Sequence, residues 1–92
     1  MGALMKTATY TVNNKMGLHA RPASEIAKVV GKHKSEVILQ AGSKKVNGKS
    51  VLMITTLGAK KGTEVTLTVT GDDEEEVFAI LDEMFANNFN EE

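Results

Sequence analysis

Residues 63–70 alternate between polar and apolar side chains, and this feature constrains the fold more than any other. Val65, Leu67 and Val69 fall on one face of an extended chain, while threonine and glutamate occupy the positions between them. A period of two is typical of a strand that buries one face and exposes the other. Such a strand needs partner strands and a covering layer, which predicts a fold of two layers.

The rest of the chain divides between strand-like and helical patterns. Further strands are predicted at 6–12, 36–40 and 44–46, the last two joined by a turn. Apolar residues spaced i, i+3, i+4 and i+7 predict a helix that begins near Arg21 and a second over about 72–85. A weaker pattern predicts a short helix over 51–57. The expected fold is therefore an α+β open-faced sandwich in the order β-α-β-β-α-β-α.

Length and composition bound the organisation of the chain. Ninety-two residues are enough for one core and too few for two. Residues 1–4 carry no pattern and precede a second methionine, so we interpret them as a cloning remnant or an alternative start, and residues 5–92 as one domain. No window approaches 18 apolar residues and no secretory signal is evident, which predicts a cytoplasmic protein without membrane insertion.

Charge is distributed unevenly along the sequence. All eleven Lys and Arg residues lie at or before Lys61, and ten of the twelve acidic residues follow it. Five lysines either form a basic rim that attracts acidic partners or are simply solvated, namely Lys28, Lys32, Lys44, Lys45 and Lys49. A nucleic-acid-binding module is the alternative from another class of function, but the basic part of the chain offers only Tyr10 for base stacking. We expect no nucleic-acid partner.

The most informative segment is Gly17-Leu18-His19-Ala20-Arg21-Pro22-Ala23-Ser24. It sets an imidazole and a fixed cation beside the start of a helix, whose free N–H groups attract anions. Most histidines at pH 7 carry a nucleophilic nitrogen lone pair. Arg21 can stabilise a phosphoryl group on His19 through charge-assisted hydrogen bonds, each worth about 1.5–3 kcal/mol. The competing interpretation is that His19 only caps the helix and Arg21 is solvated.

At these residues the chain resembles the HPr family of phosphocarriers, whose active-site signature agrees at all eight positions. A second signature of that family is similar to Ser43-Lys44 followed by the run from Lys49 to Gly58. The resemblance runs from about Lys6 to Phe85. It implies a four-stranded antiparallel sheet covered by three helices, in the element order predicted above.

The resemblance also implies a function in the phosphoenolpyruvate-dependent sugar phosphotransferase system. His19 would become a pros-phosphohistidine by accepting a phosphoryl group from enzyme I, and would donate it to the A domains of sugar-specific enzyme II components. Ala20 and Arg21 would bind the phosphoryl group through backbone N–H groups, and Arg21 also through its guanidinium. Such a protein is a monomeric carrier rather than an enzyme, and it needs no cofactor and no metal.

Ser50 matches the serine that an HPr kinase/phosphorylase modifies in some relatives, where the product acts with a catabolite control protein. The competing interpretation is an ordinary helix N-cap, a position that serine fills for roughly 1 kcal/mol. Both roles are compatible, because phosphate at a helix start meets a favourable dipole. The alternative to the carrier is thus a regulatory HPr-like paralogue, of a nitrogen branch or of catabolite repression, that acts mainly through protein binding.

Four further residues are expected to form the docking surface for partner proteins. The resemblance implies this role for Ser24, Lys28, Val51 and Leu52. For Val51 and Leu52, burial in the core is the competing interpretation. His33 lies near the end of the first helix, where we expect a structural or solvent-facing role. A metal site that joins His19 to His33 fails, because fourteen helical residues separate them by roughly 20 Å.

Overall fold

The structure is a computed structural model that describes residues 5–91 and contains four strands, three α-helices and a short 3-10 turn. Their bounds are β1 (Met5–Thr11), α1 (Ala20–Gly31), β2 (Glu36–Ala41), β3 (Lys44–Asn47), α2 (Val51–Thr55), β4 (Glu64–Thr70), α3 (Glu74–Ala86) and η1 (Asn88–Asn90). The predicted fold class and element order are confirmed. Residues 1–4 and their interpretation as a remnant lie outside the described part of the chain.

The four strands form one antiparallel sheet in the order β1-β4-β2-β3. The alternating strand β4 is central, because it pairs with β1 on one side and β2 on the other. Leu67 lies opposite Leu39, and Val69 lies opposite Val37. All four side chains are at most 1% exposed. The period of two in the sequence therefore identifies an interior strand of the sheet, with neighbours on both sides.

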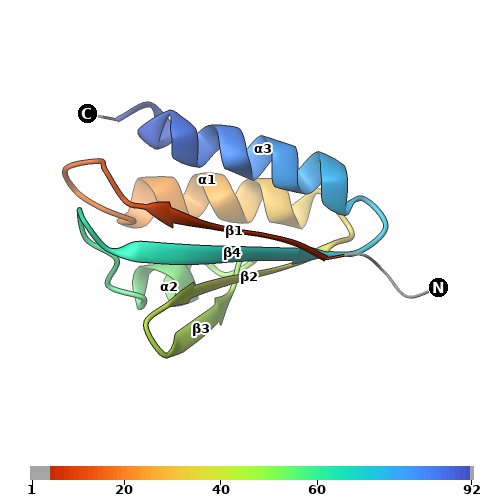
Figure 1. The fold of residues 1–92 in the computed structure, drawn as a ribbon, viewed down its shortest axis with the longest axis horizontal. Coiled ribbons are helices and arrows are strands. Elements are labelled where there is room, and N and C mark those ends of the chain that lie inside the picture. Colours follow the sequence, from red (N-terminus) through yellow and green to blue (C-terminus); the bar gives the residue numbers. More distant parts are fainter. Residues whose placement is uncertain (1–4, 92) are drawn as a thin grey trace.

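Helices α1 and α3 run side by side over one face of the sheet (Figure 1). From α1, Ile26 and Val30 are fully buried, and from α3, Val77 and Leu81 are fully buried. The helical spacing of these residues turns them all to the sheet. The side chains of Thr7 and Thr9, on edge strand β1, are exposed. The fold is the open-faced sandwich that the sequence predicted.

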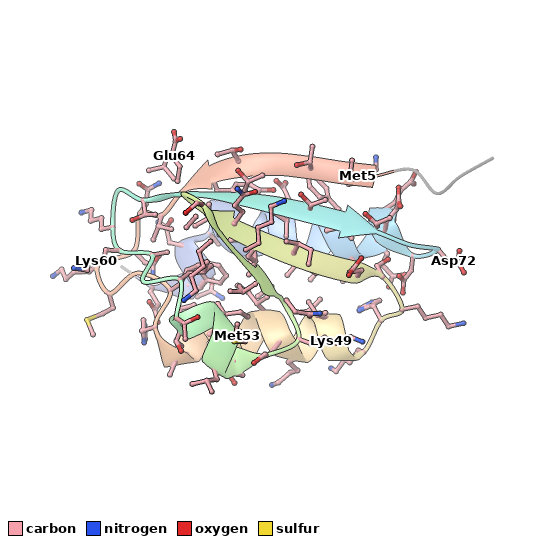
Figure 2. All side chains as sticks on the ribbon, turned by 90° about the horizontal axis from the view of Figure 1, so that it is seen from below. Met5, Lys49, Met53, Lys60, Glu64 and Asp72 are labelled. Atoms are coloured by element: carbon pink, nitrogen blue, oxygen red, sulfur yellow. The ribbon has the colours of Figure 1, made fainter. Side chains whose placement is uncertain are left out.

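Helix α2 lies beside α1 and against β3 (Figure 2). It begins after Ser50 as expected but ends at Thr55, two residues earlier than predicted. The backbone continues in tight turns, in which Leu57 donates to Ile54 and Gly58 donates to Thr55. Such i-to-i+3 bonds commonly close a helix. No helix within residues 5–91 is long and apolar enough to cross a membrane.

Candidate functional site

The loop between β1 and α1 has a fixed shape that presents His19. Gly17 has a φ of +68°, and a Cβ at this position would lie 2.3 Å from the carbonyl oxygen of Ala59. The next residue, Leu18, donates its N–H to that same oxygen at 2.9 Å and is buried in the core. Only glycine combines the left-handed backbone with this close approach. The residue that precedes His19 is therefore anchored on both its backbone and its side chain.

His19 is the N-cap residue of α1. Its φ of −80° and ψ of −168° are extended, and its carbonyl oxygen accepts the N–H of Ala23 at 3.0 Å. Its side chain makes no capping hydrogen bond and is 33% exposed. The cap is thus provided by the backbone alone, and the imidazole is left available for chemistry. Capping does not account for the presence of histidine at this position.

Ala20 and Arg21 form the first turn of α1, one residue earlier than the predicted start. The N–H groups of a first turn have no intrahelical acceptor and point along the helix axis toward the N-cap. Pro22 has no N–H and fits this turn without loss. The guanidinium of Arg21 is half exposed, and its nearest carboxylate on the same helix is Glu25, at 3.8 Å. A helix start and a cation therefore adjoin the imidazole.

Two further residues complete the site, and sequence analysis identified neither of them. The Oε2 atom of Glu91 lies 2.8 Å from His19 Nε2 and accepts the N–H of Arg21 Nε at 2.8 Å. Its Oε1 atom accepts from Asn14 Nδ2 at 2.9 Å. Asn14 is 1% exposed and also donates to the carbonyl oxygen of Gly17 at 2.7 Å. One carboxylate thus joins the histidine loop, the first helical turn and the C-terminal end of the chain.

Opposing effects act on the protonation of Glu91. Partial burial raises the pKa of its carboxyl, but hydrogen bonds from Arg21, Asn14 and His19 outweigh burial and leave the pKa below its usual range. The side chain is 17% exposed. Glu91 is therefore an anion at neutral pH. No signal in the sequence pointed to it, because it stands 72 residues from His19 and belongs to no periodic pattern.

Residues 88–91 form a strap that holds Glu91 over the site, and Figure 1 shows this end of the chain beside the loop before α1. Phe89 is 4% exposed, and its ring meets that of Phe85 edge to face at a centroid distance of 4.9 Å. Phe85 in turn stacks on Tyr10 at 4.5 Å. The guanidinium of Arg21 also donates to the backbone oxygen of Phe89. The strap is attached both to the core and to the site.

A shallow hollow of about 190 Å³ adjoins His19. Its lining comes from the histidine loop and from the segment after α2, as follows: Met16, Leu18, His19, Thr55, Gly58, Ala59 and Lys60. Sites that enclose small-molecule substrates usually measure roughly 300–1,000 Å³. The hollow has room for a phosphoryl group at a protein surface and not for a buried organic substrate.

The predicted docking residues all lie at the surface. Val51 and Leu52 are 38% and 72% exposed, so the interpretation that they belong to the core is wrong. One turn of helix separates them from Thr55, which lines the hollow, so the three share a face. On α1, Ser24 and Lys28 are exposed and follow Arg21 at helical spacing. Both helices therefore present exposed side chains to solvent.

Ser50 is the N-cap of α2, and its hydroxyl oxygen accepts the N–H of Met53 at 3.1 Å. The capping role is therefore present, and the residue is half-buried. His33 lies beyond the opposite end of α1 from His19. Its Nδ1–H donates to the carbonyl oxygen of Val29 at 2.7 Å, which gives it the expected structural role.

Comparison with known proteins gives a consistent result. The family described as "PTS HPr component phosphorylation site" matches residues 6–87. A phosphocarrier protein HPr of Xylella fastidiosa (strain Temecula1) is 37% identical over 82 residues, which cover 89% of this chain and 92% of the relative. The crystal structure of HPr-C-His from Thermoanaerobacter tengcongensis is similar, with a TM-score of 0.88 and 40% identity over 95% of this chain and 98% of its own.

A second group of structures is similar at a lower score. The solution structure of Crh, described as the catabolite repression HPr of Bacillus subtilis, has a TM-score of 0.64 and 34% identity. The match covers 92% of this chain and 94% of that one. The same backbone therefore occurs both in proteins called phosphocarriers and in a protein named for catabolite repression.

Proposed function

Since this chain belongs to the HPr family of phosphocarrier proteins, we propose that His19 accepts a phosphoryl group from enzyme I and passes it to the A domains of sugar-specific enzyme II components. The protein acts in the cytoplasm as a monomeric carrier. It is not an enzyme, because the phosphoryl group on His19 is an intermediate that only a partner can supply or remove. Phosphotransferase-dependent sugar transport is the process that it serves.

The observation that carries this proposal is the position of the imidazole. His19 stands at the start of α1 with its side chain uncommitted to the helix, next to the N–H groups of Ala20 and Arg21. A dianionic phosphoryl group on the ring would meet the positive end of the helix dipole, worth roughly 0.3–1 kcal/mol. Charge-assisted bonds from Arg21, at about 1.5–3 kcal/mol each, would contribute more. Partial exposure of the ring allows a partner protein to reach it.

The exposed apolar side chains of α2 support a docking role. Val51, Leu52 and Met53 are 38%, 72% and 41% exposed, which is unusual for three consecutive apolar residues. Apolar surface of this kind beside a reactive group is typical of a site for protein partners. Ser24 and Lys28 extend this surface along α1. Enzyme I and the A domains would bind it in turn, with His19 at its edge.

Ser50 is proposed as a second, regulatory site of phosphorylation. An HPr kinase/phosphorylase would add a phosphoryl group to its hydroxyl, and the product would bind a catabolite control protein. The hydroxyl now accepts from Met53 N–H, and phosphate oxygens could accept that bond in its place. The added charge would stand next to Val51 in the docking surface. Phosphorylation at Ser50 would therefore weaken binding to enzyme I.

A regulatory paralogue that acts mainly through protein binding is the alternative. The similarity to Crh favours it, because that protein is named for catabolite repression. The higher TM-score to the Thermoanaerobacter HPr and the presence of His19 favour the carrier. The two functions differ in whether His19 is phosphorylated at all.

The deciding experiment is phosphorylation by enzyme I and phosphoenolpyruvate, followed by mass spectrometry and ³¹P NMR. The wild-type protein should gain one acid-labile phosphoryl group on His19, and the His19→Ala variant should gain none while it keeps its fold. Ser50→Ala is the matched control and should be phosphorylated like the wild type. No modification of the wild type, by an enzyme I that phosphorylates another HPr, would contradict the proposal.

A further inference from the structure

Glu91 makes an extensive set of contacts for a single carboxylate. Its two oxygens receive hydrogen bonds from three residues, of which Asn14 and His19 belong to the loop before α1 and Arg21 to the first turn of that helix. We propose that Glu91 is a positioning residue for phosphoryl transfer, which holds the proton of His19 on Nε2 and leaves Nδ1 as the nucleophile. This inference rests on the carrier function proposed above and deepens it.

Glu91 determines which ring nitrogen of His19 carries the proton. An ionised carboxylate only accepts hydrogen bonds, so the ring nitrogen 2.8 Å from Glu91 Oε2 must donate. In a neutral imidazole the proton then resides on Nε2, and Nδ1 carries the lone pair. Within residues 5–91, no hydrogen bond occupies Nδ1 of His19. The contact therefore selects one tautomer and leaves the other nitrogen open to the partner.

The carboxylate itself is held in one orientation. Asn14 donates to Oε1, while Arg21 donates to Oε2. Because Asn14 is 1% exposed and also bonded to Gly17, it cannot follow a rotation of Glu91. Fixed partners of this kind orient the histidine ring as well as its proton, as a carboxylate does in hydrolytic triads.

Charge gives a second reason for the arrangement. In the transfer, the bond between phosphorus and the donor group of enzyme I breaks, and its electron pair returns to that group. The lone pair of His19 Nδ1 forms the new P–N bond, while the proton on Nε2 remains in place. The ring of His19 becomes cationic in this step, and the carboxylate of Glu91 is in direct contact with the N–H that shares the charge.

Three consecutive residues with a strained, left-handed backbone precede Glu91. Asn88, Phe89 and Asn90 have φ angles of 52°, 54° and 60°, a left-handed turn that L-residues rarely adopt in succession. Burial of Phe89 against Phe85 offsets the strain, as does the bond from Arg21 to the Phe89 carbonyl. The turn reverses the chain after α3 and brings Glu91 back over His19. The conformation of the strap thus determines the position of the Glu91 side chain.

Nitrogen-detected NMR of ¹⁵N-labelled protein tests the tautomer directly. At about pH 8.5, where imidazole is neutral, the wild-type ring should show a protonated Nε2 and an unprotonated Nδ1. The Glu91→Ala variant should show a mixture of both tautomers. Glu25→Gln is the matched control, since it removes the other carboxylate next to Arg21 without touching His19, and it should keep the wild-type tautomer.

The rate of phosphoryl transfer from phosphorylated enzyme I tests the consequence. Glu91→Ala should accept the phosphoryl group roughly 10-fold to 100-fold more slowly, by analogy with the loss typical when the carboxylate that orients a metal-bound imidazole is removed. Glu91→Gln should also be slow. Its single oxygen cannot accept from Asn14, His19 and Arg21 at once, and its NH₂ group must face one of these donors.

The outcomes are separable from those of the carrier proposal. An unchanged tautomer in Glu91→Ala, or an unchanged rate, would overturn the role of Glu91 while leaving the carrier function intact. A faster rate would also overturn it, because Glu91 would then compete with the incoming phosphoryl group. A wild-type protein that accepts no phosphoryl group contradicts the carrier function itself, whatever the tautomer. Amide spectra of each variant confirm that the fold is retained.

Discussion

Asp73 accepts hydrogen bonds from both the backbone N–H and the side-chain hydroxyl of Ser35. A third bond comes from the N–H of Lys34 at 3.0 Å. The carboxylate thereby ties the residue before α3 to the turn between α1 and β2. This contact lies at the opposite end of α1 from His19, so its contribution to stability can be measured without disturbing the site.

The pH dependence of stability should report on this carboxylate. Hydrogen bonds from Ser35 and Lys34 lower the pKa of Asp73 from 3.8 to about 2. A depressed pKa in the folded state stabilises the protein above the ordinary value, and the contribution is lost as the pH falls through the folded value. Urea unfolding should therefore find Asp73→Asn less stable than the wild type above pH 3.8, with a difference that shrinks toward pH 2. Asp72→Asn, at the exposed neighbouring position, should show no such trend.

His33 should give a pH dependence of opposite sign. The bond to the Val29 carbonyl raises the pKa of His33, burial opposes this, and the carboxylates of Glu76 and Asp73 add to it. A raised pKa stabilises the fold fully below the ordinary value of 6.5, and this contribution is lost as the pH rises through the folded value. His33→Gln should thus be destabilised most at about pH 5.5 and least at about pH 8.5. A constant difference in denaturant midpoint would contradict the assignment.

Substitution of Gly17 should affect both stability and the site. A Cβ would collide with the Ala59 carbonyl and would also be held at a positive φ. The positive φ costs roughly 1–2 kcal/mol for an L-residue, and the collision adds roughly 1–3 kcal/mol. Gly42→Ala is the matched control, because it has a φ of +61° and open space around its Cβ position. Chemical unfolding should show a loss for Gly17→Ala that exceeds the loss for Gly42→Ala, together with slower phosphoryl acceptance.

The Tyr10 hydroxyl should contribute modestly to stability. It donates to Asp82 Oδ1 at 2.5 Å, and burial together with this carboxylate raises the pKa of Tyr10. Tyr10→Phe keeps the stack on Phe85 and removes only the hydrogen bond, so a loss of about 1 kcal/mol is expected. Tyr10→Ala also removes the stack and should lose about 3 kcal/mol or more. Equal losses for the two variants in urea unfolding would mean that the stack contributes nothing.

Arg21→Glu should slow both acceptance and donation of the phosphoryl group. The change removes the donors that bind phosphate and places a negative charge beside Glu91. Loss of one charge-assisted bond of about 1.5–3 kcal/mol corresponds to a rate change of roughly 10-fold to 150-fold. Arg21→Lys keeps the charge without the forked donors and should fall between the wild type and Arg21→Glu. Rapid-quench kinetics should measure acceptance and donation for the wild type and both variants. Equal rates for the three proteins would show that Arg21 has no part in the mechanism.

Much of the fold could be predicted because its signals are local. The period of two in β4 and the helical spacing in α1 and α3 identify the face that each element buries, since burial repeats with the backbone geometry. The end of α2 and the strap after α3 could not be predicted in the same way. Both depend on tight turns. The left-handed turn at Asn88–Asn90 contains no glycine, the residue that usually indicates such a backbone in a sequence.

The candidate site also combines features with local sequence signals and features that depend on the tertiary structure. The sequence by itself determined that His19 and Arg21 adjoin a helix start, because eight consecutive residues contain the loop, the imidazole, the cation and the proline. Only the tertiary structure decided that Val51 and Leu52 face solvent and that Glu91 and Asn14 meet at His19. Helix geometry relates residues a few positions apart, whereas a contact across 72 residues depends on how α3 crosses the sheet and where Phe89 is buried.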